Sequence, residues 1–418
     1  MIDRALFERI AKRIDSYEPD MIRLQIALTA IPALAPENGG DGEAGRAEFL
    51  RECLRGFGFS SVENCDAPDL RASGGIRPNL VVRLPGRNAG RTVWVMSHTD
   101  VVPPGELRLW ERDPYEGYVR GGKVFGRGTE DNQQDLVASI FAAKAFLDEG
   151  IVPESAIGLL FAADEETASL YGLDYVMNHR REWFRKTDLI VVPDAGNEEG
   201  SMIEVAEKSV LWVQFHTTGK QCHASRPSLG ANAFRAASHL AVRMEELRRI
   251  YGATDPLYDP PESTFEPTKK DANVPNVNTI PGDDIFYLDC RILPVYPVDE
   301  VLTTMRNIAD EVEKQFGVQI QITPVQKADA PPPTAHDSPV VSALKAAVKE
   351  VYGVEAKPMG IGGGTVAAVF RKHDYPAAVW SRYCHMAHQP NEYCLIANMV
   401  GNAKVYAYLF LQKAGVMA

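Results

Sequence analysis

Short apolar runs alternate with helical stretches over the first 200 residues of the chain. Apolar residues fill positions 93–96, 157–163, 189–192 and, much later, 377–380, and polar residues follow each run. Runs of this length that end in polar loops are typical of buried strands in a parallel sheet, whereas residues 135–148 have a helical pattern. The alternation predicts an α/β layer fold with a mostly parallel central sheet flanked by helices.

From about Ser209 the order of the expected elements changes. The pattern predicts a strand over 210–217, a helix over 231–250, a short strand near Val277, a strand over 285–293, a helix over 298–316 and a strand over 318–323. We expect one apolar face on the first helix, formed by Phe234, Ala237, Leu240, Met244 and Leu247. This βαββαβ order is that of a complete ferredoxin-like α+β unit.

A proline-rich linker, Ala330-Pro331-Pro332-Pro333, follows this unit. After it the pattern predicts a helix over 339–351, a glycine-rich turn, the strand at 377–380 and a last helix over 395–413. Candidate site residues lie on both sides of the ferredoxin-like segment. We therefore expect residues 1–206 and 329–418 to form one discontinuous catalytic domain, and residues 207–328 to be an inserted domain.

Acidic and histidine side chains stand directly after the apolar runs. In chain order they are His98 and Asp100, Glu165 and Glu166, Asp194, and His385 and His388, with Asp131 just before the helix at 135–148. Because ligands of parallel sheets collect at the carboxyl ends of the strands, these groups should converge. Like-charged carboxylates repel by about 4 kcal/mol per pair at about 4 Å and an effective dielectric near 20, so a cation is expected between them. Imidazole nitrogen with carboxylate oxygen is the ligand mix of zinc and related divalent metals.

Composition narrows the possible functions. The chain has 418 residues, enough for two domains, with 45% hydrophobic and 24% charged residues. A net charge of -12 without a basic patch disfavours binding to nucleic acid or to an anionic membrane. The charged N-terminus lacks the apolar core of a signal peptide, and no stretch approaches the roughly 20 apolar residues of a membrane span. The six cysteines form no CxxC pair, which favours reduced thiols and a cytoplasmic enzyme acting on small molecules.

Five motifs in one order carry a resemblance to a known family. They are His98-Thr99-Asp100, Gly126-Arg127-Gly128 through Asp131-Asn132, Asp164-Glu165-Glu166, Pro193-Asp194-Ala195-Gly196 and His388-Gln389-Pro390-Asn391-Glu392. They resemble the motifs of the dizinc amidohydrolases and metallopeptidases that include acetylornithine deacetylase, succinyl-diaminopimelate desuccinylase, aminoacylase and carboxypeptidase G. The resemblance covers nearly the whole chain.

The resemblance implies two divalent metal ions, zinc in the first place and cobalt or manganese as alternatives. Asp131 would bridge the ions, His98 and Asp194 would complete one site, and Glu166 and His388 would complete the other. His388 is preferred over His385 because only His388 carries the Asn391-Glu392 tail. The resemblance also implies a cis peptide between Asp131 and Asn132.

Catalytic and substrate-binding roles follow from the same resemblance. Glu165 would be the general base, Asp100 would hold the His98 ring, and His223 would stabilise the oxyanion, in some relatives across a dimer. Asn278 and Arg291 match positions that bind a substrate carboxylate, which a guanidinium suits. The glycine-rich turn lacks the lysine of a P-loop, so we interpret Gly363, Gly364 and Thr365 as backbone close to the substrate. Two departures, Gln133-Gln134 in place of lysine and glycine and Val366 in place of aspartate, bear on substrate choice.

The leading hypothesis is a metal-dependent hydrolase of an amide bond next to a carboxylate-bearing amino acid, of the N-acyl-amino-acid deacylase type. A metallo-carboxypeptidase or dipeptidase using the same site is the alternative. A non-catalytic metal-binding scaffold is a further one, although Glu165 and all five expected ligands are present. A serine or cysteine hydrolase is disfavoured because no Gly-x-Ser-x-Gly elbow occurs and Cys222 and His223 lack an evident orienting partner. The expected partners are a small N-acyl amino acid or short peptide and a second copy of the chain, bound through the inserted lid or dimerisation domain.

Overall fold

The computed structural model describes residues 2–412. The chain forms two compact units, which are Met1–Val205 with Pro333–Pro358 and Thr365–Ala418, and Ala206–Pro332 with Met359–Gly364. Within the part that the structure describes, no helix has the length and apolar surface that a membrane crossing requires.

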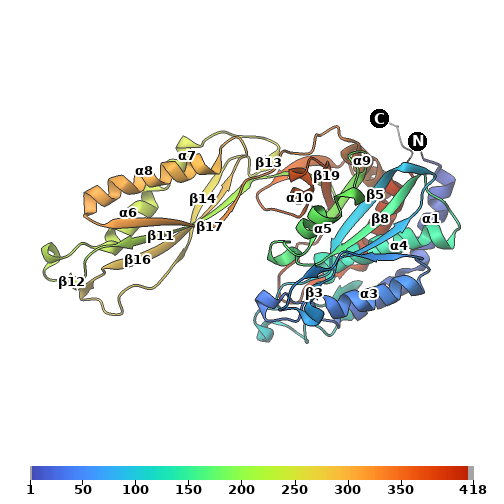
Figure 1. The fold of residues 1–418 in the computed structure, drawn as a ribbon, viewed down its shortest axis with the longest axis horizontal. Coiled ribbons are helices and arrows are strands. Elements are labelled where there is room, and N and C mark those ends of the chain that lie inside the picture. Colours follow the sequence, from blue (N-terminus) through green and yellow to red (C-terminus); the bar gives the residue numbers. More distant parts are fainter. Residues whose placement is uncertain (1, 413–418) are drawn as a thin grey trace. The chain divides into compact units, whose positions relative to one another are not determined.

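The first unit is built on a large sheet (Figure 1). The strands that begin in the first unit, not all of which join this sheet, are β1 (Val62–Asn64), β2 (Ala67–Pro68), β3 (Ile76–Arg77), β4 (Leu80–Leu84), β5 (Asn88–His98), β6 (Tyr118–Arg120), β7 (Lys123–Phe125), β8 (Ser155–Ala162), β9 (Leu189–Asn197), β10 (Met202–Glu207), β18 (Lys357–Ile361), β19 (Ala377–Arg382) and β20 (Tyr393–Leu395). Within the first unit the sheet has the order β1-β4-β8-β5-β9-β19-β10-β18, and its central strands β8, β5, β9 and β19 are parallel. The predicted mixed α/β fold with a mostly parallel central sheet is confirmed.

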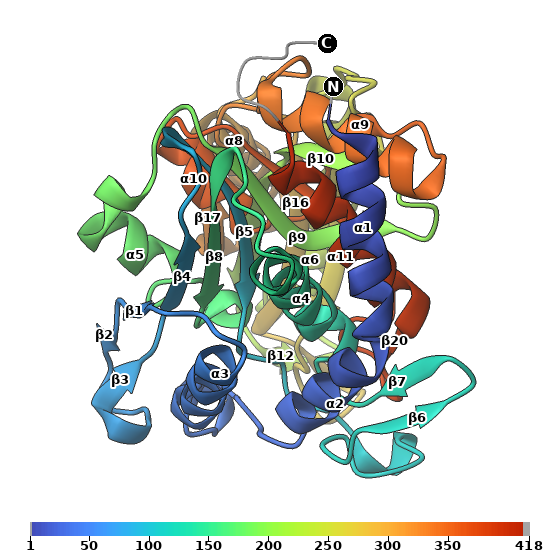
Figure 2. The ribbon, with the colours of Figure 1, turned by 90° about the vertical axis from the view of Figure 1, so that its right-hand side faces the viewer.

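Helices cover both faces of this sheet. They are α1 (Arg4–Ser16), α2 (Glu18–Thr29), α3 (Ala44–Gly56), α4 (Gln134–Asp148), α5 (Leu173–His179), α9 (Pro339–Tyr352), α10 (Ala367–Lys372) and α11 (Ile396–Phe410). Trp94 and Met96 of β5 pack in one cluster with Val176 of α5 and Phe370 of α10, while the alternate residues Val93 and Val95 are also buried. Helices α1, α4 and α11 contact one another (Figure 2), and α4 and α11 contact β5 and β8. Burial on both faces explains why these strands are uninterrupted apolar runs.

The predicted last helix over 395–413 corresponds to α11, which ends at Phe410. Its predicted end, Lys413, lies outside the described residues.

A buried carboxylate joins three elements of the first unit. Asp135 of α4 accepts hydrogen bonds from Ser381 Oγ of β19 at 2.7 Å and from Asn402 Nδ2 of α11 at 2.8 Å. It also accepts from Tyr406 OH of α11 and from Gln134 Nε2 at 3.1 Å. Asp135 is fully buried, so these donors replace the water that the carboxylate loses on folding.

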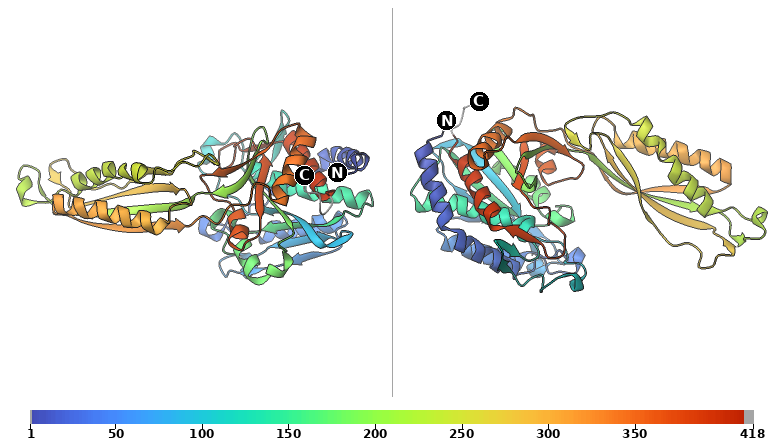
Figure 3. Two further views of the ribbon diagram at one scale, coloured as in Figure 1. Left: turned by 90° about the horizontal axis from the view of Figure 1, so that it is seen from above. Right: turned by 180° about the vertical axis from the view of Figure 1, so that it is seen from behind.

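The second unit contains a four-stranded antiparallel sheet and two layers of structure (Figure 3). Its elements are β11 (Ser209–Thr218), β12 (Cys222–His223), α6 (Ala233–Arg243), α7 (Glu246–Ile250), β13 (Tyr258–Asp259), β14 (Thr264–Lys270), β15 (Thr279–Ile280), β16 (Asp283–Ile292), α8 (Val298–Phe316) and β17 (Gln319–Ala328). The sheet order is β14-β16-β11-β17, and α6 and α8 pack on it. With β11, β14, β16 and β17 as the four strands, this is the predicted ferredoxin-like βαββαβ unit.

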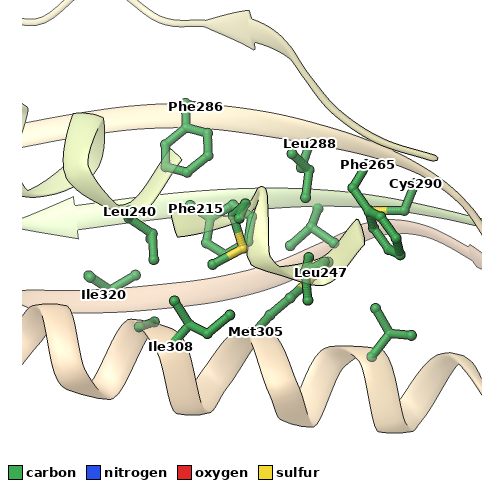
Figure 4. Close-up of a cluster of buried hydrophobic side chains, with 14 of the residues drawn as sticks. Phe215, Leu240, Leu247, Phe265, Phe286, Leu288, Cys290, Met305, Ile308 and Ile320 are labelled. Carbon is green, nitrogen blue, oxygen red and sulfur yellow. The ribbon is translucent and has the colours of Figure 1, made fainter. Parts of the chain in front are cut away.

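The core of this unit lies between the sheet and the two long helices (Figure 4). Phe215 of β11 and Leu288 of β16 meet Leu240 of α6 and Met305 of α8 there. Along β11, alternate residues point away from this core, and Trp212 is 40% exposed. One buried and one solvated face is the usual arrangement of an antiparallel sheet.

Two local predictions for this unit are wrong. The helix predicted over 231–250 is two helices, α6 and α7, separated at Met244 and Glu245. Phe234 is 45% exposed and not on the apolar face, because the buried stripe of α6 is formed by Ala233, Ala236, Ala237 and Leu240, and Phe234 is one position away from it.

The strand predicted near Val277 is β15, which pairs with β12 outside the four-stranded sheet. The second strand of the ferredoxin-like unit is instead β14, which lies between the predicted helix over 231–250 and the predicted strand near Val277, where no element was expected. β14 lies at a sheet edge, has one buried residue, Phe265, and carries Pro267 at a register shift. It therefore lacks the alternation that identifies a strand.

We predict that Asp135→Asn destabilises the first unit. The amide keeps one acceptor oxygen but points an NH₂ group at two of the four donors, and a buried network broken in this way costs about 2–4 kcal/mol. Urea unfolding measures the change in free energy, with the exposed Glu8→Gln as a control expected to stay within about 0.5 kcal/mol. Equal stability of the two variants would contradict the assigned role of Asp135.

Candidate active site

All five residues predicted as metal ligands lie in the first unit, close to the ends of its central strands. His98 is the last residue of β5, and Asp194 lies on the neighbouring strand β9. Asp131 lies in the helical turn Thr129–Gln133 that leads into α4, and Glu166 in the short turn Glu165–Thr167 after β8. His388 lies in the irregular segment between β19 and β20. Adjacent parallel strands thus bring together residues that are up to 290 positions apart.

Three of these residues form a first group. His98 Nε2 lies 3.0 Å from Asp131 Oδ1 and 3.4 Å from Asp194 Oδ1. One nitrogen or oxygen atom from each residue lies within 4.8 Å of the others, close enough for one ion to contact all three.

A second group shares Asp131. His388 Nε2 lies 3.2 Å from Asp131 Oδ2 and 3.2 Å from Glu166 Oε2. The two oxygens of Asp131 therefore face different groups, one each. The peptide between Asp131 and Asn132 is cis, as the resemblance implies.

The electrostatics of both groups favour positive charge. Burial lowers the pKa of His98, but hydrogen bonds with Asp100, Asp131 and Asp194 outweigh it and hold that pKa well above its usual value. Hydrogen bonds with Asp131 and Glu166 raise the pKa of His388 to about 10. Burial and then the charge of Asp131 raise the pKa of Glu166 to about 7.

The donor set fits divalent cations. Glu166 Oε1 is buried and has no hydrogen-bond partner among the described residues, although its other oxygen faces His388. An orphaned carboxylate oxygen beside imidazole nitrogens suits a metal that takes mixed nitrogen and oxygen ligands. Each group offers three candidate ligands, which is the number found in catalytic zinc sites that keep a position for water.

Asp100 connects the first group to the turn that carries the two glutamates. Its carboxylate accepts the backbone N–H of Glu165 at 3.1 Å and that of Glu166 at 3.0 Å. The same carboxylate lies 3.4 Å from His98 Nδ1, and the Asp100 carbonyl oxygen lies 3.1 Å from it. One side chain therefore fixes both the His98 ring and the direction of the glutamates.

Glu165 lies beside Glu166 but belongs to neither group. Burial, followed by the charge of Asp194, raises its pKa well above the usual value. A carboxyl group that binds a proton this readily has the character of a general base.

A buried ion pair supports the glutamate turn from behind. Arg77 and Glu43 are both fully buried and form a bidentate pair. Arg77 Nη2 also lies 3.3 Å from Asp164 Oδ1, and Glu43 accepts the Asp164 N–H at 3.3 Å. Neither residue was expected at the site from the sequence, because an isolated arginine and a glutamate 34 positions apart are typical of surface charges. Glu130 and Glu392 were not expected to have a role either, although both lie within the quoted motifs and accept backbone N–H groups beside the site.

Three of the remaining candidate catalytic and substrate-binding residues lie in the second unit. His223 is exposed on β12, and its Nδ1 accepts the N–H of Ser225 at 3.1 Å. The backbone oxygen of Asn278 accepts the N–H of Ala224, which places Asn278 beside the His223 strand. Arg291 of β16 forms a bidentate pair with Asp289, at 2.8 and 3.0 Å, and donates to the Gly362 carbonyl oxygen at 3.1 Å.

The glycine-rich turn divides between the units. Gly363 and Gly364 belong to the second unit and Thr365 to the first, where its hydroxyl lies 3.5 Å from Glu204. A Cβ added at Gly363 would meet no atom within 4 Å, so there is open space beside this glycine.

The departures from the family pattern have structural roles near the site. Gln133 accepts a hydrogen bond from Thr29, and Gln134 joins the Asp135 network. Val366 is buried in the core beside α10. His385 is exposed and is absent from both candidate groups.

Comparison with known proteins agrees with this geometry. The model of peptidase family M20/M25/M40 matches residues 94–412. The chain belongs to this family. It is also 38% identical over 409 residues to an uncharacterized metallohydrolase of Methanococcus maripaludis, covering 93% of this chain and 97% of the relative. The suspected family is confirmed, and the protein is a metal-dependent hydrolase of amide or peptide bonds.

Two further similarities of this M20 protein are to proteins with named activities. A succinyl-diaminopimelate desuccinylase of Rhodospirillum centenum is 26% identical over 391 residues, covering 93% of this chain and 96% of the relative. The crystal structure of human carnosine dipeptidase 1 matches with a TM-score of 0.74 at 17% identity, covering 98% of this chain and 99% of the other. At that identity the structural match shows the fold alone.

Proposed function

We propose that this protein hydrolyses the amide bond of N-acyl amino acids, as a deacylase of the acetylornithine deacetylase and succinyl-diaminopimelate desuccinylase type. The observation that carries the proposal is the pair of imidazole and carboxylate groups that share Asp131, with Glu165 directly beside them. Similarity to a desuccinylase over more than nine-tenths of both chains supports the choice of an acyl substrate.

His98, Asp131 and Asp194 would hold one divalent ion, and Asp131, Glu166 and His388 the other, with zinc preferred over cobalt or manganese. Such ions lower the pKa of a water molecule and polarise a carbonyl group when they are bound. Asp100 keeps the His98 ring and both glutamates in place for this arrangement. Glu165 accepts the proton of the attacking water and later delivers it to the leaving nitrogen.

His223 is proposed to donate a hydrogen bond to the oxyanion. Because its Nδ1 accepts from Ser225, the neutral ring carries its proton on Nε2, which is then the donor. Asn278 lies on the same hairpin and would bind the substrate next to it.

Recognition of the substrate carboxylate is assigned to Arg291, with Gly363, Gly364 and Thr365 providing backbone beside the substrate. Asp289 and the Gly362 carbonyl already engage the Arg291 guanidinium and hold it in one orientation. The Nη1 and Nη2 groups retain further N–H donors, since a guanidinium has five.

A metallo-carboxypeptidase or dipeptidase is the second candidate function for the same site. Its support is the family description and the fold shared with human carnosine dipeptidase 1. A screen of N-acetyl and N-succinyl amino acids against dipeptides, with the zinc- and the cobalt-loaded protein, separates the two.

We also propose that the protein is a cytoplasmic homodimer joined through the second unit. The solvated face of that unit exposes Trp212 and Val325, and β14 and β17 end its sheet without a further strand. Sedimentation equilibrium should give twice the mass of one chain, whereas a monomer at micromolar concentration would exclude this assembly.

We predict that Glu165→Gln lowers turnover by about 10²- to 10⁴-fold, because glutamine cannot accept the proton of the attacking water. Metal content, measured by atomic emission, should equal that of the unsubstituted protein, since Glu165 belongs to neither candidate group. The exposed Glu182→Gln on the same unit is the control and should retain full turnover. Undiminished activity of Glu165→Gln would remove this residue from the mechanism.

We predict that a strong chelator abolishes hydrolysis and that added zinc or cobalt restores it. The variant Cys222→Ser should keep turnover within about two-fold, because no thiol takes part in the proposed reaction. Activity that survives the chelator with the metal shown to be removed, or that is lost in Cys222→Ser, would favour a cysteine hydrolase instead.

A further inference from the structure

Two buried glutamates, Glu130 and Glu392, link the segment that carries Asp131 to the segment that carries His388. Glu130 accepts the backbone N–H groups of Cys384, Met386 and Ala387, the last at 3.2 Å. In the opposite direction, Glu392 accepts the N–H groups of Gly128, Glu130 and Asp131, at 3.0, 2.9 and 3.1 Å. Each segment therefore supplies one carboxylate and receives the other. We call this arrangement the glutamate clamp.

Both members of the clamp are shielded from water. Glu130 and Glu392 have no exposed surface, and Arg127 Nη1 lies 2.6 Å from Glu392. Hydrogen bonds from N–H groups to a buried carboxylate are stronger than bonds between neutral groups. Six such bonds connect the two segments, beside the pairing of β7 with β20.

The segment around His388 has no regular secondary structure, and its other hydrogen bonds include Tyr383 N–H to the Asn197 carbonyl oxygen and Asn391 Nδ2 to the Leu109 carbonyl oxygen. Residues 383–391 form no helix or strand, and His385, His388 and Asn391 have φ values of 58°, 64° and 57°. Non-glycine residues adopt this left-handed conformation only where the surroundings impose it. Glu130 accepts three N–H groups from residues 384–387, immediately before His388, and so holds the backbone from which the His388 ring projects.

The two candidate metal groups depend on Glu130 to different degrees. The group of Asp131, Glu166 and His388 requires the clamped segment, and the His388 side chain is 56% exposed. The group of His98, Asp131 and Asp194 is formed by β5, β9 and the turn before α4 and takes no residue from 383–391.

We propose that Glu130 is a positioning residue that sets the metal affinity of the His388 group without setting that of the His98 group. The proposal rests on the proposed function, since it presumes one ion in each group. Loss of an outer partner of a metal ligand typically lowers metal affinity by about 10- to 100-fold. In this protein the loss should fall on one of the two ions.

The test is a titration of the metal-free, full-length protein with Co²⁺, in which calorimetry and the visible absorption of the bound ion measure binding. The unsubstituted protein should bind two equivalents. In Glu130→Gln one equivalent should bind within about two-fold of normal and the other about 10- to 100-fold more weakly. Excess Co²⁺ should restore kcat with an unchanged KM.

Asp188→Asn is the matched control. Asp188 is a buried carboxylate that accepts the N–H of Thr92, Trp94 Nε1 and the N–H of Arg185, at 2.7, 3.0 and 2.9 Å. Its partner Thr92 lies six residues before His98 on the same strand, which is about 20 Å away. This variant should lose stability and bind both equivalents normally.

Glu130→Asp provides the test if Glu130→Gln does not fold. It keeps the charge and both oxygens but withdraws them by one methylene, and should weaken the same equivalent to a smaller extent. Normal binding of both equivalents in the Glu130 variants, or equal weakening of both, would overturn the proposal and leave the proposed function intact. A single equivalent in the unsubstituted protein would overturn both.

Discussion

Mutual repulsion between carboxylates is the constraint around which the first unit is arranged. Asp131, Glu166 and Asp194 present oxygens within a few ångströms of the same two imidazoles, and Asp100 and Glu165 lie next to them. Oriented backbone dipoles supply much of the compensation, since Asp100 accepts two N–H groups and Glu130 and Glu392 three each. The hydrogen-bonded sheet holds the carboxylates in place against their repulsion, and their remaining negative charge attracts cations.

Most of the candidate ligand positions could be singled out from the sequence because two simple signals coincide. An apolar run marks a buried strand, and a histidine or acidic residue within a few positions of the end of that run lies near the common edge of the sheet. His98, Glu166 and Asp194 follow this pattern. Their supporting residues do not. Arg77 and Glu43, or Glu130 and the N–H groups it accepts, are partners only after folding, and no periodicity relates them.

The fold of the second unit was also predictable in outline. The prediction was wrong where the pattern of apolar and polar residues is weak. The strand over 285–293 and the helix over 298–316 show full alternation or a full apolar stripe, and both are present as β16 and α8. β14 has a single buried residue and a proline, so its pairing with β16 supplies the order that its sequence lacks. Tertiary hydrogen bonding, and not local preference, forms that strand.

The clamp also limits how this part of the chain can vary. Glu130 immediately precedes Asp131, and Glu392 follows His388 by four residues. One residue inserted or deleted between a candidate ligand and its glutamate would move the carboxylate out of reach of the N–H groups on the other segment. The candidate ligand itself would keep its place. An irregular loop is normally the place where chains change length freely. Here hydrogen-bond geometry fixes the number of residues between a candidate ligand and its glutamate, so a segment without regular structure should tolerate changes of length as poorly as the inside of a helix.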